Sequence, residues 1–155
     1  MKNLRRNFRK QAGFNLIELM IVIAIIALLI GIGIPAYRSM VNAGNETSAV
    51  QSIQNLKTLQ TSYASKHQGK FAKDFDELIR SVQLDERYAG QNPVVNGYIF
   101  TMKIDDPSAT KPAKYSVNAD PQEGSGTRHF YFDSTLGTTK ATEESRQAKF
   151  DDPSL

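Results

Sequence analysis

An uninterrupted apolar run near the N-terminus limits what this chain can fold into. Sixteen consecutive residues, 19–34, are Leu, Met, Ile, Val, Ala or Gly, whereas the mean hydropathy of the whole chain is −0.40. As an α-helix, residues 14–34 would extend about 31 Å, which matches the hydrocarbon thickness of a bilayer. The run therefore predicts one membrane-spanning helix attached to a polar domain.

Basic residues crowd the N-terminal side of this run. Five of the nineteen Lys and Arg residues lie in the first ten positions: Lys2, Arg5, Arg6, Arg9 and Lys10. The remaining fourteen face sixteen acidic residues, so the rest of the chain carries a formal charge of −2. This distribution argues against a generic basic protein, and we predict no nucleic-acid partner. By the positive-inside rule, residues 1–13 stay in the cytoplasm and the chain after Tyr37 lies outside it.

Two simpler explanations of the run are a secretory signal and a plain membrane anchor. A signal peptide has a shorter apolar core followed by a small-residue cleavage site. Here the apolar core is long, and Gly31-Ile32-Gly33-Ile34-Pro35 stands where the cleavage site would be expected. A plain anchor does not explain Glu18. An unpaired carboxylate costs about 2.5–3.5 kcal/mol near the bilayer centre, so Glu18 predicts a partner within the membrane.

The residues around Glu18 carry a resemblance to a known family. The segment begins Ala12-Gly13-Phe14-Asn15-Leu16-Ile17-Glu18, and the run ends in Ile34-Pro35-Ala36-Tyr37. Over about the first forty positions it resembles the class III leader and first helix of type IV pilins and type II secretion pseudopilins. The resemblance implies that a prepilin peptidase cleaves after Gly13 and methylates the new amino terminus at Phe14. Asn15 stands where Thr or Ser is usual in the family.

The resemblance gives Glu18 a role in assembly. Cleavage would remove the basic leader and keep the apolar helix. The α-amino group of Phe14 and a neighbouring Glu18 carry opposite charges in a medium of low dielectric constant, so their pairing would offset burial and penalise a subunit out of register. We therefore expect a homo-oligomeric helical filament, built by an inner-membrane pilus or secretion assembly machinery.

The helix is expected to continue beyond the membrane. Pro35 lacks a backbone donor, so together with Gly31 and Gly33 it predicts a kink. Residues 36–66 contain no proline and keep one apolar stripe, which predicts a long bent helix ending at about Lys66. The stripe consists of Ala49, Val50, Ile53, Leu56, Leu59, Gln60 and Tyr63.

Weaker signals follow the helix. Gly69 predicts the helix exit, and Asp74 with Glu77 resembles a capping box for a short helix at 74–82. Three β-rich runs, 97–104, 114–119 and 128–133, suggest an antiparallel meander, and 137–141 is a candidate fourth strand. The core is expected to contain Ile53, Leu56, Tyr63, Leu78, Tyr98, Phe100, Tyr115, Val117, Phe130 and Phe132.

The predicted fold class is α+β, with a long bent N-terminal helix, half transmembrane and half amphipathic, packed on a small antiparallel sheet. The expected segments are a cleaved leader (1–13), a transmembrane and polymerisation helix (14–35), an amphipathic helix (36–66), an α+β head region (67–141) and a loosely ordered tail (142–155).

Catalytic and metal-binding patterns are sparse. His67 and His129 are the only histidines, they lack metal-ligand spacing, and we expect both on the surface or in loops. There is no cysteine, and Gly124-Ser125-Gly126 is not a nucleophile elbow. The acidic pairs at 105–106, 143–144 and 151–152 match no EF-hand loop. We predict a non-enzymatic protein without cofactor or metal.

The favoured function is a structural subunit of a type IV pilus-like filament, anchored by a single pass in the inner membrane with its head outside the cytoplasm, then assembled at the cell surface. A type II secretion pseudopilin ranks second, because the Asp-Pro-Trp-Gly type segment of major pseudopilins is absent and the chain has no tryptophan. A third hypothesis is a membrane-tethered binding module that never polymerises.

Overall fold

The computed structural model describes residues 13–105, 107–108 and 111–155. The chain divides into an N-terminal part, which ends at Arg38, and a head domain, Ser39–Leu155. Helix α1 (Leu16–Lys66) contributes residues to both. Of the predicted leader only Gly13 is described, and Asp106 of the first acidic pair also lies outside the described residues.

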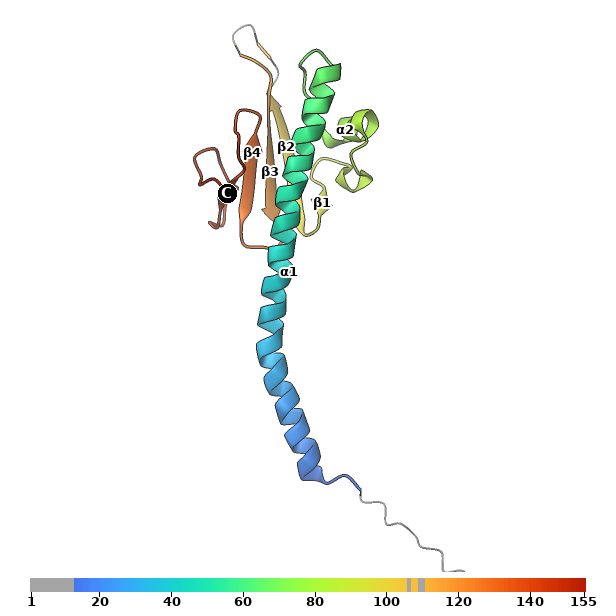
Figure 1. Ribbon diagram of the computed structural model, residues 1–155, viewed down its shortest axis with the longest axis vertical. Coiled ribbons are helices and arrows are strands. Elements are labelled where there is room, and N and C mark those ends of the chain that lie inside the picture. Colours follow the sequence, from blue (N-terminus) through green and yellow to red (C-terminus); the bar gives the residue numbers. More distant parts are fainter. Residues whose placement is uncertain (1–12, 106, 109–110) are drawn as a thin grey trace, which may run out of the picture. The chain divides into compact units, whose positions relative to one another are not determined.

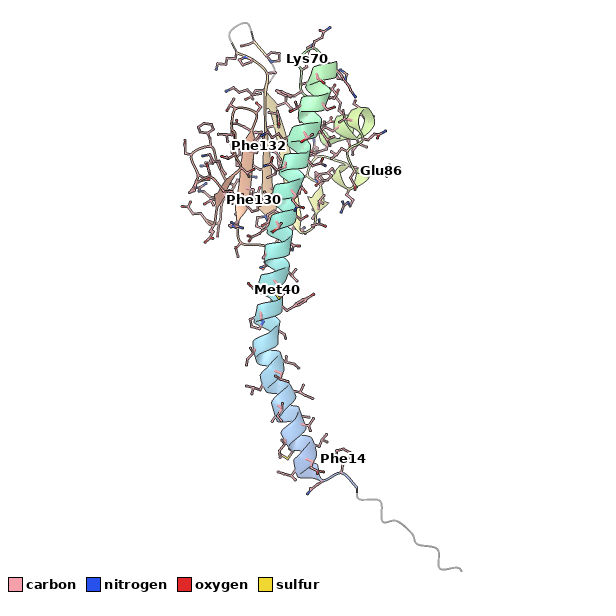
Figure 2. All side chains as sticks on the ribbon, viewed as in Figure 1. Phe14, Met40, Lys70, Glu86, Phe130 and Phe132 are labelled. Atoms are coloured by element: carbon pink, nitrogen blue, oxygen red, sulfur yellow. The ribbon has the colours of Figure 1, made fainter. Side chains whose placement is uncertain are left out.

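The N-terminal part is an apolar helix. Among the described residues, α1 is the one helix that is long and apolar enough to cross a bilayer, and the apolar window that meets this test is not buried in the structure. Figure 2 shows its side chains standing off the helix from Phe14 onward. Pro35 lies inside α1, and residues 31 and 33 are helical as well. The predicted kink stays a prediction.

The sheet of the head domain confirms the predicted antiparallel meander (Figure 1). Five strands lie in chain order, each antiparallel to the next. They are β1 (Val94–Val95), β2 (Tyr98–Asp105), β3 (Lys114–Pro121), β4 (His129–Asp133) and β5 (Lys140–Thr142). The central pair β2 and β3 runs in register from Tyr98 opposite Pro121 to Asp105 opposite Lys114. Strand β1 was not predicted, because two residues show no alternation.

Local signals around the end of α1 are confirmed in detail. Gly69 adopts a φ of 83° and its N–H donates to the Ala64 carbonyl, as a helix exit requires. Helix α2 (Phe75–Val82) begins after Asp74, whose carboxylate accepts the Glu77 N–H at 2.7 Å. The Glu77 carboxylate accepts in return from the N–H of Lys73, one residue before the N-cap. A 3₁₀ turn, η1 (Glu86–Tyr88), follows α2.

The core lies between residues 39–66 of α1 and the sheet. Side chains at helical spacing on α1 are buried: Glu46, Ala49, Ile53, Leu56, Gln60 and Tyr63. All ten predicted core residues belong to the buried cluster. Phe75 and Tyr88, which the sequence analysis did not select, also belong to it, and the Tyr88 ring meets Phe100 edge-on at 5.4 Å. The α+β class is therefore confirmed.

The loose order predicted for the tail, 142–155, stays a prediction, and the structure shows a group of ion pairs within this segment. Arg146 donates from both terminal nitrogens to the Asp152 carboxylate, at 2.9 and 2.6 Å, and from Nε to Glu144 at 2.6 Å. Ala148 is buried, and its carbonyl accepts from the Asn118 side chain of β3 at 3.0 Å. The charges that suggested disorder are of both signs, and here they pair with each other.

Candidate assembly site

The predicted cleavage bond lies in accessible, non-helical backbone. Residues 13–15 precede the first helical residue, Leu16. Gly13 is exposed, Phe14 is 90% exposed, and among the described residues no atom beyond the chain neighbours lies within 4 Å of the position a Cβ would take at Gly13. A protease needs an accessible backbone, and the described residues of this segment are exposed and not helical.

Glu18 closes the first turn of the helix. Its carboxylate accepts the backbone N–H of Asn15 at 3.1 Å, while the Asn15 side chain accepts the N–H of Ile17 at 3.4 Å. The two residues therefore form a reciprocal cap at the start of α1. Asn15 keeps the capping capacity of the Thr or Ser usual at this position. Sequence reasoning assigned Glu18 to a partner subunit and missed this local bond, which the Asn-x-x-Glu spacing indicates.

The N-terminal part exposes a continuous apolar surface. Every large apolar side chain from Phe14 to Met40 is between 47% and 90% exposed. Gly31 and Gly33 have nothing within 4 Å of a Cβ position, so they relieve no clash within the described chain. Together with Ala27, Gly31 gives the small-residue spacing that lets another helix approach closely. Apolar surface on this scale requires lipid or other helices around it.

In the head domain, α1 is bonded to the loop between β3 and β4 through a buried carboxylate. Glu46 accepts from the Thr127 N–H at 3.1 Å, from the Thr127 hydroxyl at 3.0 Å and from Arg128 Nε at 2.7 Å. Burial alone would raise the pKa of Glu46, but these three hydrogen bonds and the Arg128 charge hold it below its ordinary value. Sequence analysis missed Glu46, although its helical spacing from Ala49 and Ile53 places it on the buried stripe.

Close backbone packing explains the glycines of the same region. Asn45 donates to the Ser125 carbonyl at 2.9 Å. Gly97 has a φ of 77°, and a Cβ there would lie 2.6 Å from the Ser125 Cβ. A Cβ at Gly126 would overlap the buried Tyr98 hydroxyl. Gly97 and Gly126 thus allow the loop to pack closely, because neither position has room for a side chain.

The two histidines have different environments. His67 is exposed in the turn after α1, as predicted, and its ring stacks on Tyr63 with centroids 3.9 Å apart. The prediction for His129 is wrong. It lies within β4, partly buried, with Nδ1 2.7 Å from Asp120 Oδ1. Among the described residues, no group of three or more His, Cys, Asp or Glu side chains is placed to hold a metal ion.

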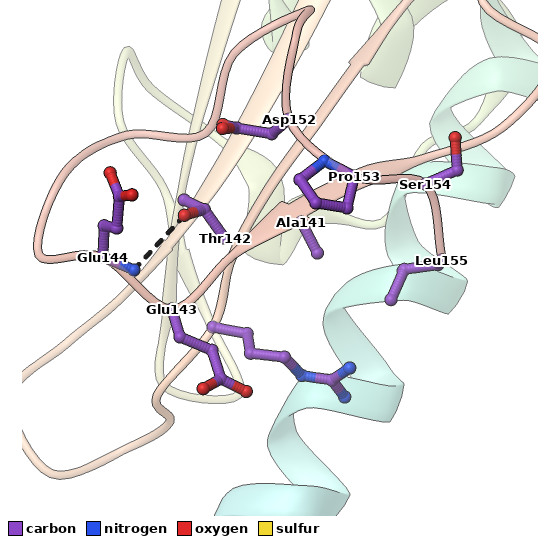
Figure 3. A pocket seen from close by; sticks show the side chains of 9 residues that line it. Ala141, Thr142, Glu143, Glu144, Asp152, Pro153, Ser154 and Leu155 are labelled. Atoms are coloured by element: carbon purple, nitrogen blue, oxygen red, sulfur yellow. Dashed lines mark hydrogen bonds between the residues drawn. The ribbon is translucent and has the colours of Figure 1, made fainter.

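A hollow of about 610 Å³ lies beside the C-terminus, between the tail and β5 (Figure 3). Glu143, Glu144 and Asp152 line it together with Arg128. The Arg146 guanidinium and the Lys149 N–H lower the pKa of Asp152 to about 2, and Glu144 bonds to the same guanidinium. Glu144 and Asp152 are therefore already paired with Arg146 within the chain, so their position beside the hollow does not require a bound cation.

Comparison with known proteins gives matches over both the helix and the head domain. The family described as "Prokaryotic N-terminal methylation motif" matches residues 8–34. The type IV major pilin protein PilE of Neisseria gonorrhoeae is 32% identical over 120 residues, which cover 74% of this chain and 71% of that protein. Prepilin peptidase-dependent protein D of Escherichia coli is 45% identical over 60 residues, 39% of this chain and 41% of that protein. A fimbrial protein of Pseudomonas aeruginosa is 48% identical over 50 residues, 32% of each chain.

Proposed function

The chain belongs to the type IV pilin family, and on that premise we propose that it is a structural subunit of a pilus filament that assembles through its N-terminal helix. One observation carries the proposal most directly: the apolar side chains of residues 14–40 are exposed, and a single acidic residue, Glu18, lies at the start of their helix. Before assembly, lipid would cover this apolar surface. In the filament, the helices of neighbouring subunits would cover it.

Processing begins with cleavage between Gly13 and Phe14 by a prepilin peptidase, followed by methylation of the Phe14 amine. Before cleavage, the basic leader holds the chain as a single pass in the inner membrane with the head outside the cytoplasm. After cleavage, the subunit has lost that charged anchor and can leave the bilayer for the filament. The exposed, non-helical backbone at Gly13 supports this order of events.

Glu18 then pairs with the Phe14 amine of an adjacent subunit. In the isolated chain, its carboxylate accepts only one hydrogen bond among the described residues, from the Asn15 N–H. A carboxylate has room for several donors, so a neighbouring ammonium can bind without displacing the cap. Breaking such a buried pair by deleting one partner typically costs about 3–5 kcal/mol, and the loss would recur at every added subunit.

Intact-mass measurement on sheared filaments tests the processing step. We expect a mature chain that starts at Phe14, has 142 residues and carries one added methyl group. A mass that retains residues 1–13, or that lacks the whole apolar helix, would contradict the processing proposal.

Two substitutions at Glu18 separate its charge from its capping role. Glu18→Gln keeps an acceptor for the Asn15 N–H and removes the charge, and Glu18→Ala removes both. We expect both variants to insert into the membrane and to be cleaved, and neither to form filaments. Asn15→Ala is the matched control, because it weakens the cap by about 0.5–2 kcal/mol and leaves the charge in place. Filament yield by shearing and microscopy, beside a blot of mature subunit in membranes, gives the readout; normal filaments from Glu18→Gln would sink the pairing proposal.

The pseudopilin alternative predicts a different result when cells are viewed by electron microscopy. A secretion pseudopilin would assemble without extending surface filaments at ordinary expression, and a membrane-tethered module would not assemble at all. Electron microscopy of surface filaments labelled against the head domain separates the three hypotheses. We expect long labelled filaments.

A further inference from the structure

Positive charge gathers around a hollow at the end of α1. The hollow has a volume of about 290 Å³, and its lining includes Lys66, His67, Lys70 and Lys73. Figure 2 shows Lys70 beside the last turn of the helix. All four side chains are exposed and lie within eight consecutive positions that contain no acidic residue.

Aromatic rings give this hollow fixed walls. Tyr63 is only 6% exposed, and its ring stacks on His67 with an interplanar angle of 9°. Phe71, which also lines the hollow, meets the Tyr115 ring of β3 edge-on at 4.7 Å. The hollow is therefore lined both by lysines and by aromatic rings that pack at the edge of the core.

The one carboxylate in the lining is already engaged on both oxygens. Glu77 Oε1 accepts the Tyr63 hydroxyl at 2.5 Å, and Oε2 accepts the Lys73 backbone N–H at 2.7 Å. These bonds hold the pKa of Glu77 below its ordinary value. Glu77 thus offsets one positive charge. None of the ion pairs between described residues involves Lys66, Lys70 or Lys73, so the lining keeps a formal excess of two positive charges without counting His67.

The carbonyl groups at the end of α1 are the next possible partners of these lysines. A helix C-terminus carries free carbonyls that attract positive side chains. Here the Gly69 N–H donates to the Ala64 carbonyl at 2.9 Å, and the Lys70 N–H donates to the His67 carbonyl at 3.1 Å. Backbone donors thus satisfy these exit carbonyls, and the ammonium groups remain available to a ligand.

We propose that this hollow binds a phosphate or sulfate group. Such an oxyanion carries several acceptor oxygens, and charge-assisted bonds from ammonium groups are stronger than neutral ones. The lining supplies three ammonium groups and the Gln68 amide as donors, and its only carboxylate is occupied. The site lies in the head domain, at the opposite end of α1 in sequence from the apolar residues 14–40 that are proposed to assemble the filament, so this binding goes beyond the proposed pilus function.

The two histidines make the test unusually direct. They are the only ones in the chain; His67 lines the hollow, and His129 lies in β4 bonded to Asp120. Mature chain in detergent micelles, labelled with ¹³C at the histidine rings, is titrated with inorganic phosphate at constant pH and ionic strength. We expect a saturable movement of the His67 resonance while the His129 resonance stays in place. Movement of both resonances together, or the same His67 movement with sodium chloride, would overturn the proposal.

Substitutions locate the binding. Lys66→Gln combined with Lys70→Gln should raise the apparent Kd for phosphate at least about tenfold, because two of the three ammonium groups are lost. Lys149→Gln is the matched control, since it removes one exposed positive charge outside the hollow and should leave the Kd unchanged. An unmoved His129 resonance shows that each variant is folded. A double variant that titrates like the parent chain would refute the assignment.

Three probes distinguish where the group comes from. Inorganic phosphate, inorganic sulfate and glucose 6-phosphate are compared under the same conditions. Equal affinities for all three indicate recognition of the free oxyanion, whereas tighter binding of glucose 6-phosphate indicates a group carried on a sugar. Either result supports the proposal, and no saturable His67 movement with any of the three rejects it.

Discussion

Helix α1 has two regions in which apolar side chains of the same type differ in exposure to solvent. Ile23, in the N-terminal part, is 57% exposed, whereas Ile53, in the head domain, is fully buried. The first region is apolar on every side and has no polar face to turn toward water. The second is apolar on one stripe only, and this stripe is covered by the sheet. An apolar side chain thus favours burial away from water. The distribution of apolar residues around the helix indicates whether its own chain can bury that side chain.

The two glutamates of the helix show the same contrast. Glu46 is 7% exposed and receives three hydrogen bonds from Thr127 and Arg128 within its own chain. Glu18 receives one bond from Asn15 and faces no cation among the described residues. A buried charge needs a partner in either region. For Glu46 the fold supplies it; for Glu18 our proposal assigns this role to the Phe14 amine of an adjacent subunit.

The largest expected effect comes from separating the two regions. A version of the chain that begins at Ala43 keeps the bonds of Glu46 to Thr127 and Arg128, and it keeps the five-stranded sheet. We expect it to be soluble and to unfold cooperatively, with modest stability because the core is small. It should form no filaments at all. Circular dichroism during heating checks the fold, and a featureless melt would show that the head domain depends on the N-terminal part.

A matched pair of substitutions on α1 tests the contrast between the isoleucines. Ile53→Ala should lower the free energy of unfolding of the head domain by about 2–5 kcal/mol, because it leaves a cavity in the core. Ile23→Ala should leave that free energy unchanged within about 0.5 kcal/mol and should instead reduce filament yield. Urea unfolding of the full mature chains in detergent gives the first quantity and shearing the second. A loss of head-domain stability in Ile23→Ala would break the distinction.

A smaller effect is expected at Glu46. Glu46→Ala leaves the Thr127 donors and Arg128 without their acceptor, which should cost about 1–3 kcal/mol, toward the lower end because the Arg128 side chain is 38% exposed. Glu46→Gln, which retains an acceptor, should cost less. The pKa of Glu46 is lowered by folding, so its contribution is complete above the ordinary value of 4.5 and is lost as the pH falls below it. Unfolding free energies of the Ala43 version across this pH range measure the effect, and equal pH profiles for Glu46→Gln and the parent would contradict it.

The smallest effect concerns the tail. Folding lowers the pKa of Asp152 from 3.8 to about 2, so the contribution of its bonds to Arg146 is complete above about pH 4 and disappears as the pH falls toward 2. As the pH falls from about 4 to 2, the free energy of unfolding of Asp152→Asn should therefore decrease less than that of the parent chain. Hydrogen exchange at Lys149, whose N–H donates to Asp152, should rise in the variant at neutral pH. Unchanged exchange would show that the tail is held by its other bonds alone.

Much of the head domain could be predicted from the sequence because its signals are local. The alternation from Tyr98 to Ile104 places aromatic rings on one face of β2, and the spacing from Ala49 to Tyr63 marks the buried face of α1. Strand β1 and the 3₁₀ turn η1 escaped prediction. Strand β1 exists because Val94 and Val95 pair with Ile99 and Tyr98, and two residues alone contain no periodicity.

What the sequence by itself determined is an apolar helix long enough to cross a membrane, the Gly13-Phe14 junction and Glu18 near the start of that helix, because each depends on run length or on neighbours a few positions apart. The tertiary structure alone decided how the loop after β3 is held. Glu46 and Thr127 are separated by 81 positions, and Asp120 meets both His129 and the tail residue Gln147. Such contacts exist only once the meander has formed, since sheet pairing brings these distant segments to one place and no periodicity in the chain records it.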